Sequence, residues 1–282
     1  MVEIHEWDAR DTVALLREPT ADDHKYSRGV LGVRTGSQEY PGAAVLGVEA
    51  AWRTGLGMVR YLGPDRPADL VLQRRPETVT VPGRVQAWLI GSGTDAATRA
   101  AAETARLSEL LQGEVPVVVD AGALDLVPGA SAPLVVTPHR SEHARLRGLL
   151  GLDDTEPTSL VERVASARET AAAARITVLL KGAETVVAAP DGWSTVVRAG
   201  TGWLATAGTG DVLGGILGAI VAARGAQHDL DAAALAPLAA AAAYVHGHAA
   251  RSAGPGPITA LDVAEAVPAV IATLLVGGDP AR

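Results

Sequence analysis

Short runs of β-branched residues alternate with alanine-rich segments through the first two thirds of the sequence. This alternation is typical of βα units, in which each strand of a largely parallel sheet is followed by a helix. The predicted strands are residues 29–36, 57–63, 85–91, 115–122, 132–139 and 176–182. The predicted helices are residues 43–55, 96–111, 141–150 and 160–174. The pattern therefore predicts an α/β fold built around a mainly parallel sheet.

The alternation ends after Lys181. The segments ETVVAA and WSTVVRAG flank a turn at Asp191-Gly192, which predicts a β-hairpin, and the remainder of the chain reads as helices at residues 211–224, 229–252 and 259–277. No internal repeat or low-complexity linker divides the sequence. Residues 1–282, of which 48% are hydrophobic, are therefore expected to form a single domain with a sizeable core.

Composition excludes several classes of protein. The chain has no cysteine, which rules out disulfides and thiolate metal sites. Its formal net charge is -8 and it has no run of basic residues, so a nucleic-acid partner is not expected. The N-terminal residues carry acids where a signal peptide needs positive charge, and the alanine-rich runs are too short to span a membrane. A cytoplasmic protein without a membrane partner is expected.

Residues 200–211, GTGWLATAGTGD, combine four glycines with one acid just before an apolar helical segment. Glycines before a helix expose backbone N–H groups that can hold phosphate oxygens, and the helix dipole adds to this attraction. A carboxylate at the same place repels a phosphate. Asp211 is therefore either a plain helix-start residue or a base that takes a proton from a hydroxyl as it attacks phosphorus. The glycines favour the second interpretation.

The run GTGWLATAGTGDVLGGILGAIVA resembles the signature of the ADP/ATP-dependent NAD(P)H-hydrate dehydratases, which belong to the ribokinase-like superfamily. Five further segments match that family in order, at residues 36–60, 89–95, 117–124, 135–146 and 178–192. The resemblance implies a ribokinase-like three-layer α/β/α sandwich that ends in a β-hairpin and helices. The epimerase domain that some relatives carry at the N-terminus has no room in 282 residues and is not expected.

The resemblance also implies the residues of a site. Asp211 is matched as the catalytic base and as a substrate contact. The other residues matched to the substrate site are Ala43, Gly93 and His139. The residues matched to the adenine nucleotide are Lys181, Gly182, Ala183, Glu184, Thr185, Gly208, Thr209 and Gly210. No residue of the protein itself is assigned as a metal ligand.

The reaction implied is dehydration of (6S)-NADHX or (6S)-NADPHX, the 6-hydroxy forms of NADH and NADPH, with ADP or ATP as co-substrate. Phosphoryl transfer to the hydroxyl makes a good leaving group, and elimination of phosphate restores NADH or NADPH. Backbone N–H groups at Gly208–Gly210 are expected to stabilise the transferred phosphoryl group. Mg²⁺ is expected to bridge the nucleotide phosphates. The protein is expected to be a homo-oligomer.

Three alternatives stay open. A small-molecule kinase of the same superfamily would share the glycine-rich loop and the acid. An NAD(P)-dependent oxidoreductase is suggested by GSGTDA at residues 91–96, a near match to the dinucleotide fingerprint, with Asp120 as the acid for a ribose. A nucleotide-binding regulator without turnover is the third.

Several positions depart from the family pattern. Trp203 lies where the family has glycine, and we expect its indole to lie within the substrate cleft and partly close it. Arg140 and Ser141 replace a Pro-Gly pair, and Ser141 is a suitable N-cap for the helix that follows. His246 and the nearby His248 do not have metal-ligand spacing and are interpreted as core or helix-surface residues.

Overall fold

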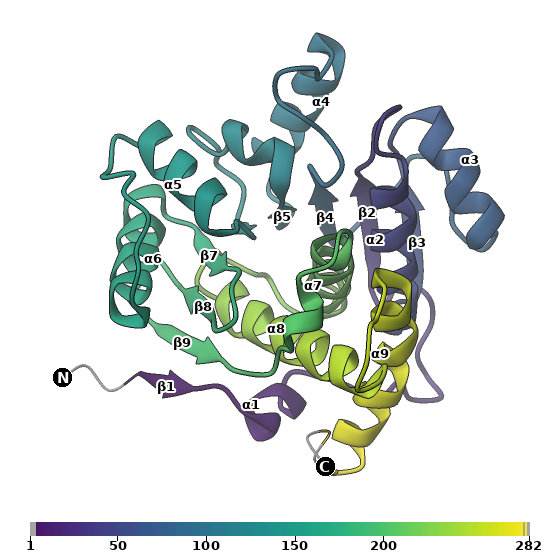
Figure 1. The fold of residues 1–282 in the computed structure, drawn as a ribbon. Helices are drawn as coiled ribbons and strands as arrows, with labels where there is room; N and C mark the ends of the chain where they lie inside the picture. Colours follow the sequence, from purple (N-terminus) through teal and green to yellow (C-terminus); the bar gives the residue numbers. More distant parts are fainter. Residues whose placement is uncertain (1–3, 279, 281–282) are drawn as a thin grey trace.

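The computed structural model describes residues 4–278 and 280. Its strands form one sheet in the order β1-β9-β8-β7-β6-β5-β4-β2-β3 (Figure 1). The bounds are β1 (His5–Glu6), β2 (Val30–Arg34), β3 (Met58–Tyr61), β4 (Ala87–Ile90), β5 (Val117–Val119), β6 (Leu134–Val136), β7 (Thr177–Leu180), β8 (Thr185–Ala188) and β9 (Ser194–Val197). All six predicted strands and both hairpin strands are therefore present.

The sheet is parallel except around β8, which runs antiparallel to both β7 and β9. The turn between β8 and β9 contains Gly192 at φ +94°, and the Asp191 carboxylate accepts a hydrogen bond from the Trp193 backbone N–H at 2.9 Å. Glycine adopts this left-handed conformation without strain. The hairpin predicted from Asp191-Gly192 is confirmed.

Helices cover both faces of the sheet, which makes three layers (Figure 1). Along β5, Val118 packs into the core cluster on one face, whereas Val117 and Val119 pack into the cluster on the other. Because successive side chains of a strand point to opposite faces, this apolar alternation requires both faces to be buried. One face is covered by α2 (Gly42–Arg53), α7 (Thr209–Gly225), α8 (Leu235–Ser252) and α9 (Ala260–Leu275), and the other by α4 (Ala101–Leu111), α5 (Arg140–Leu149) and α6 (Leu160–Ala174).

Some elements differ from the prediction. The predicted helix 96–111 begins only at Ala101, because residues 91–98 form turns. The helix predicted to be capped by Ser141 begins one residue earlier, at Arg140, and its N-cap is His139. The elements that the sequence analysis did not predict are β1, α1 (Ala9–Val13), α3 (Asp65–Arg74) and the 3₁₀ turns η1 (Ala121–Leu126) and η2 (Gly202–Leu204).

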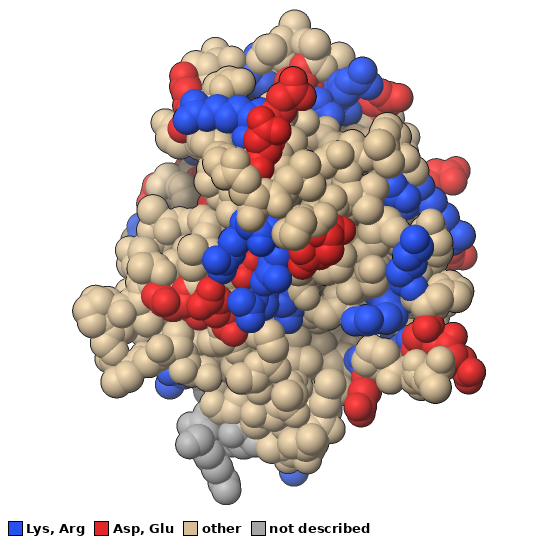
Figure 2. Space-filling view, turned by 90° about the vertical axis from the view of Figure 1, so that its right-hand side faces the viewer, with Lys and Arg blue, Asp and Glu red and all other residues tan. Residues whose placement is uncertain are grey.

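A buried carboxylate links three helices on the α2 side of the molecule. Glu49 of α2 is fully buried and accepts hydrogen bonds from Arg53, Arg74 and Arg75, and Arg74 also pairs with Glu265 of α9 at 2.8 Å. Burial disfavours the charged form, but these hydrogen bonds outweigh it and lower the pKa of Glu49. Figure 2 shows that basic and acidic residues lie beside one another over this side of the surface.

None of the helices in the described ranges is both long enough and apolar enough to pass through a lipid bilayer.

Candidate active site

The residues predicted for the site gather where the parallel strands end. Gly93 follows β4, His139 follows β6 and Lys181 follows β7, while α2 and α7 begin at the same edge of the sheet. In parallel sheets this edge is where ligands usually bind. A pocket of about 610 Å³ opens here, and its lining includes His139, Lys181, Gly182, Ala183, Thr185, Thr209, Gly210, Leu213 and His246. Most of the predicted nucleotide residues therefore share one cavity.

The start of α7 provides donors for an anion. Gly208, its N-cap, has φ +91°, and a Cβ at this position would lie 2.5 Å from the Leu46 side chain. Only glycine suits both constraints. The Thr209 N–H donates to the Thr206 carbonyl, whereas the N–H groups of Gly210 and Asp211 have no acceptor among the described residues. These two N–H groups are available for phosphate oxygens at a helix N-terminus.

Lys181 lies against this helix start. A Cβ built on Gly210 would be 3.6 Å from the Lys181 ammonium, and that ammonium donates to Asp120 at 2.9 Å and lies 3.8 Å from Glu142. Burial favours the neutral amine, but the Asp120 and Glu142 carboxylates outweigh it and raise the pKa of Lys181. The pocket thus holds a fixed cation beside the free N–H groups of α7.

Asp120 is buried and hydrogen-bonded to three protein donors. Its carboxylate accepts hydrogen bonds from Ser92 at 3.0 Å, Thr137 at 2.7 Å and Lys181. A ribose-binding acid needs free acceptor capacity, and a dinucleotide fingerprint needs a helix directly after its glycines. Residues 91–98 instead form turns. This geometry removes the structural basis of the oxidoreductase alternative.

Asp211 is mostly buried in the first turn of α7. Burial, with a smaller effect of the Asp120 carboxylate, raises the pKa of Asp211 to about 7 against the opposing effect of Lys181. A carboxyl group with this pKa can accept a proton near neutral pH, which is what a general base requires. The first turn also places its backbone beside α2, since a Cβ on Gly47 would be 3.6 Å from the Asp211 carbonyl oxygen.

Ala43 and Gly93, both predicted to contact substrate, lie side by side. A Cβ built on Gly93 would be 2.5 Å from the Ala43 Cβ, and Gly93 has φ +66°. Ala43 is one turn before Gly47 on α2, so the pair lies near Asp211 on the side toward α2. Asp211 is not among the described residues that line the pocket, but its carboxyl group interacts electrostatically with Lys181 and its backbone lies beside α2, which carries Ala43.

His139 and Glu142 hold the start of α5. The His139 ring accepts a hydrogen bond from the Glu142 N–H at 3.3 Å, and the Glu142 carboxylate accepts from the His139 N–H at 2.8 Å. This reciprocal capping box leaves the His139 side chain half exposed in the pocket wall. Arg140 and Ser141 follow it without disturbing the helix start.

Glu184 and Trp203 differ from the expected arrangement. The Glu184 carboxylate pairs with Arg163 at 2.7 Å and Arg198 at 2.9 Å, and Glu184 is not among the described residues that line the pocket. The Trp203 backbone belongs to the loop that forms one wall, but its indole is 45% exposed and does not line the pocket. The expectation that this indole closes the cleft is therefore wrong for the cavity that the structure forms.

His246 was interpreted from the sequence as a core or helix-surface residue, and the structure shows that it also lines the pocket. It is 8% exposed, yet its ring lines the same pocket as Lys181. The sequence signal was weak, because His246 lies in an alanine-rich helix with no motif that marks a ligand. Ser92 and Thr137, which hold Asp120, also lay outside the predicted site residues.

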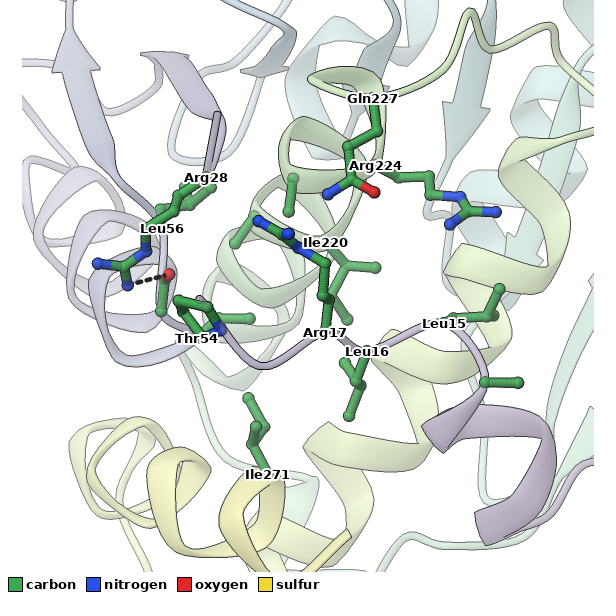
Figure 3. Close-up of a pocket in the computed structure, with 15 residues that line it drawn as sticks. Leu15, Leu16, Arg17, Arg28, Thr54, Leu56, Ile220, Arg224, Gln227 and Ile271 are labelled. Atoms are coloured by element: carbon green, nitrogen blue, oxygen red, sulfur yellow. Dashed lines mark hydrogen bonds between the residues drawn. The ribbon is translucent and has the colours of Figure 1, made fainter. Parts of the chain in front are cut away.

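A separate cavity of about 220 Å³ lies at the opposite edge of the sheet (Figure 3). Figure 3 shows Leu16, Ile220 and Ile271 around it, with Arg28 donating to the Gly55 carbonyl at its margin. It contains none of the residues predicted for the site.

Comparison with known proteins agrees with this geometry. The family model described as NAD(P)H-hydrate dehydratase matches residues 31–268. The bifunctional NAD(P)H-hydrate repair enzyme Nnr of Mycobacterium tuberculosis is 44% identical over 230 residues, which cover 77% of this chain and 46% of that protein. The ADP-dependent (S)-NAD(P)H-hydrate dehydratase of Neisseria meningitidis is 34% identical over 246 residues, which cover 81% of this chain and 78% of the relative.

A crystal structure of the ADP/ATP-dependent NAD(P)H-hydrate dehydratase from Bacillus subtilis, co-crystallised with ATP/Mg²⁺, superposes with a TM-score of 0.82 at 26% identity. The match covers 97% of this chain and 100% of that one. The ribokinase-like fold predicted from the sequence is confirmed. The chain spans just under half the length of the M. tuberculosis protein. With a family model that covers most of its residues, the chain belongs to the NAD(P)H-hydrate dehydratase family.

Proposed function

We propose that the chain catalyses the ADP- or ATP-dependent dehydration of (6S)-NADHX and (6S)-NADPHX to NADH and NADPH. The observation that carries this proposal is the position of Asp211. Its carboxyl group has a pKa of about 7 and interacts electrostatically with Lys181, which lines the pocket, while its backbone lies beside α2, the helix that carries Ala43. A base in this place can take the proton of a hydroxyl that attacks a nucleotide phosphate. The names of the relatives support the same reaction.

In the first step, the Asp211 carboxylate takes the proton from the C6 hydroxyl of the substrate. At the same time, the oxygen of that hydroxyl bonds to the terminal phosphorus of the nucleotide. The bond between that phosphorus and the nucleotide oxygen breaks, and the shortened nucleotide leaves. The N–H groups of Gly210 and Asp211 and the Lys181 ammonium stabilise the charge on the phosphoryl group. In the second step, the lone pair of the ring nitrogen breaks the C6–O bond and expels phosphate, and the departing phosphate takes a proton from the adjacent carbon, which forms the double bond.

We expect Mg²⁺ to bind at this site together with the nucleotide. Among the residues that the structure describes, no group of three or more His, Cys, Asp or Glu side chains could hold a metal ion. Mg²⁺ readily binds through phosphate oxygens and water with few protein ligands, so it would arrive with ADP or ATP and neutralise phosphate charge.

A second hollow at the same edge offers room for the rest of the substrate. It has a volume of about 390 Å³, and its lining includes Tyr40, Thr94, Gly122, Glu142 and Leu149. Thr94 directly follows Gly93 in the chain, so the hollow continues from the Ala43–Gly93 pair. We place the dinucleotide part of the substrate here. The homo-oligomeric state and the cytoplasmic location stay predictions of the sequence.

Incubation with chemically hydrated NADH and ADP or ATP tests the proposal, because recovery of the dihydronicotinamide absorbance reports the reaction. Signal is expected only when nucleotide is present, and Asp211→Asn should lower its rate by about 10²–10⁴-fold. A kinase would instead accumulate a stable phosphate ester of some other hydroxyl compound. Consumption of nucleotide without recovered absorbance would therefore contradict the dehydratase proposal.

A further inference from the structure

His246 is buried in the wall of the nucleotide pocket with unused hydrogen-bonding capacity. It lies on α8, and its neighbours in the lining are Thr209 and Leu213 of α7. Its Nε2 atom is buried and has no hydrogen-bond partner among the described residues. A buried polar atom without a partner costs stability, so it requires an explanation.

The environment fixes the protonation state of the ring. Burial lowers the pKa of His246 to about 4, with a further lowering by the Lys181 charge and an opposing effect of a backbone hydrogen bond to Thr209. The ring is therefore neutral near pH 7. Because the bond to Thr209 raises the pKa of the ring, its partner is the Thr209 carbonyl, which can only accept, so this bond uses the single N–H of the neutral imidazole. The nitrogen that remains is an acceptor.

We propose that His246 recognises the nucleoside part of ADP or ATP, where its free nitrogen accepts a hydrogen bond from an amino or hydroxyl group. This inference rests on the proposed function, because it assumes that the pocket holds an adenine nucleotide. Phosphate oxygens are themselves acceptors and would repel an acceptor nitrogen. They are suited instead to the Lys181 ammonium and the free N–H groups of α7. The apolar side chains of Leu204 and Leu213 line the pocket with His246 and suit a nucleoside.

Calorimetric titration with ADP, adenosine and inorganic pyrophosphate tests this division of the pocket. His246→Leu should lower the affinities for ADP and adenosine by the same factor, about 3- to 10-fold, which is the usual effect of losing one hydrogen bond. It should leave pyrophosphate binding unchanged. His246→Gln keeps an acceptor and should recover much of the affinity. Lys181→Ala should show the opposite pattern, with loss for ADP and pyrophosphate but not for adenosine.

His248→Leu is the matched control, since it changes a buried histidine two residues further along α8 that lines a different cavity. It should leave all three affinities unchanged, and thermal melts of each variant check that α8 stays folded. Unchanged affinity for adenosine in His246→Leu would overturn the inference while leaving the proposed function intact. Wild-type protein that binds no adenine nucleotide would overturn both.

Discussion

Replacing Asp211, the proposed base, should make the protein more stable while it removes activity. Asp211 has a pKa of about 7 in the fold, compared with an ordinary value of 3.8. The fold therefore binds this proton more tightly than the unfolded chain does. The contribution of Asp211 to the free energy of unfolding is therefore at its full value below pH 3.8 and is lost as the pH rises through about 7. The two pKa values differ by about three units, and each unit corresponds to about 1.4 kcal/mol. The free energy of unfolding should therefore fall by up to about 4 kcal/mol over this pH range.

Asp211→Asn keeps the shape of the side chain and cannot ionise. At pH 8 its free energy of unfolding should therefore exceed that of the wild type by up to about 4 kcal/mol. The gain should shrink as the pH falls and vanish near pH 4. Turnover should fall by about 10²–10⁴-fold, and wild-type turnover should itself fall about tenfold per pH unit below 7.

Urea titrations at pH 5 to 8, together with the hydrated-cofactor assay, measure both effects. Asp229→Asn, in the exposed segment between α7 and α8, is the control and should change neither stability nor turnover. An Asp211→Asn variant that is less stable than the wild type at pH 8 would refute the electrostatic reasoning. Turnover close to the wild-type value would remove Asp211 from the mechanism.

The remaining predictions concern phosphate binding, packing and the loop. Lys181→Ala should lower the affinities for ADP and ATP, measured by calorimetry, more than the affinity for adenosine, because the proposed partner of Lys181 is a phosphate. Glu49→Gln should lower the free energy of unfolding by about 2–3 kcal/mol, since three guanidinium groups lose a buried carboxylate. Gly215→Ala should cost about 1–3 kcal/mol, because its Cβ would lie 2.2 Å from a backbone oxygen of α2, whereas Gly202→Ala, in open space, should cost little in the same denaturation assay. Trp203→Ala should leave KM unchanged and change the free energy of unfolding by no more than about 0.5 kcal/mol, because the indole is exposed. A raised KM would show instead that the indole contacts the substrate in the cleft.

The main strands could be predicted because each is a short apolar run buried on both faces. The elements that the sequence did not reveal are stabilised by distant partners. β1 is only two exposed residues long, and it forms a strand because His5 and Glu6 pair with Thr195 and Val196 of β9. α3 buries only Pro67 and Val71, which is too few apolar positions to give a helical period.

The residues of the candidate site could be predicted from the sequence, but the ion pairs and hydrogen bonds that join them could not. Short motifs identified Lys181 and Asp211, because glycines, acid and lysine follow strands or precede a helix. The ion pair between Lys181 and Asp120 joins residues 61 positions apart, and no local pattern encodes it. Histidine is also outside the usual set of N-cap residues, so Ser141 was predicted as the cap where His139 performs that role.

The structure also resolves the conflict between an acid and an anion site at the start of α7. A permanently charged carboxylate there would oppose phosphate binding, whereas a carboxyl group with a pKa of about 7 is neutral in about half of the molecules near neutral pH. Under the proposed function, the burial that raises the pKa of Asp211 would therefore also reduce its repulsion of the nucleotide. Lys181 limits this effect, because its charge keeps the ionised form of Asp211 accessible. Under the proposed function, base strength and phosphate affinity would thus depend on the same balance between burial, the Asp120 carboxylate and the Lys181 ammonium.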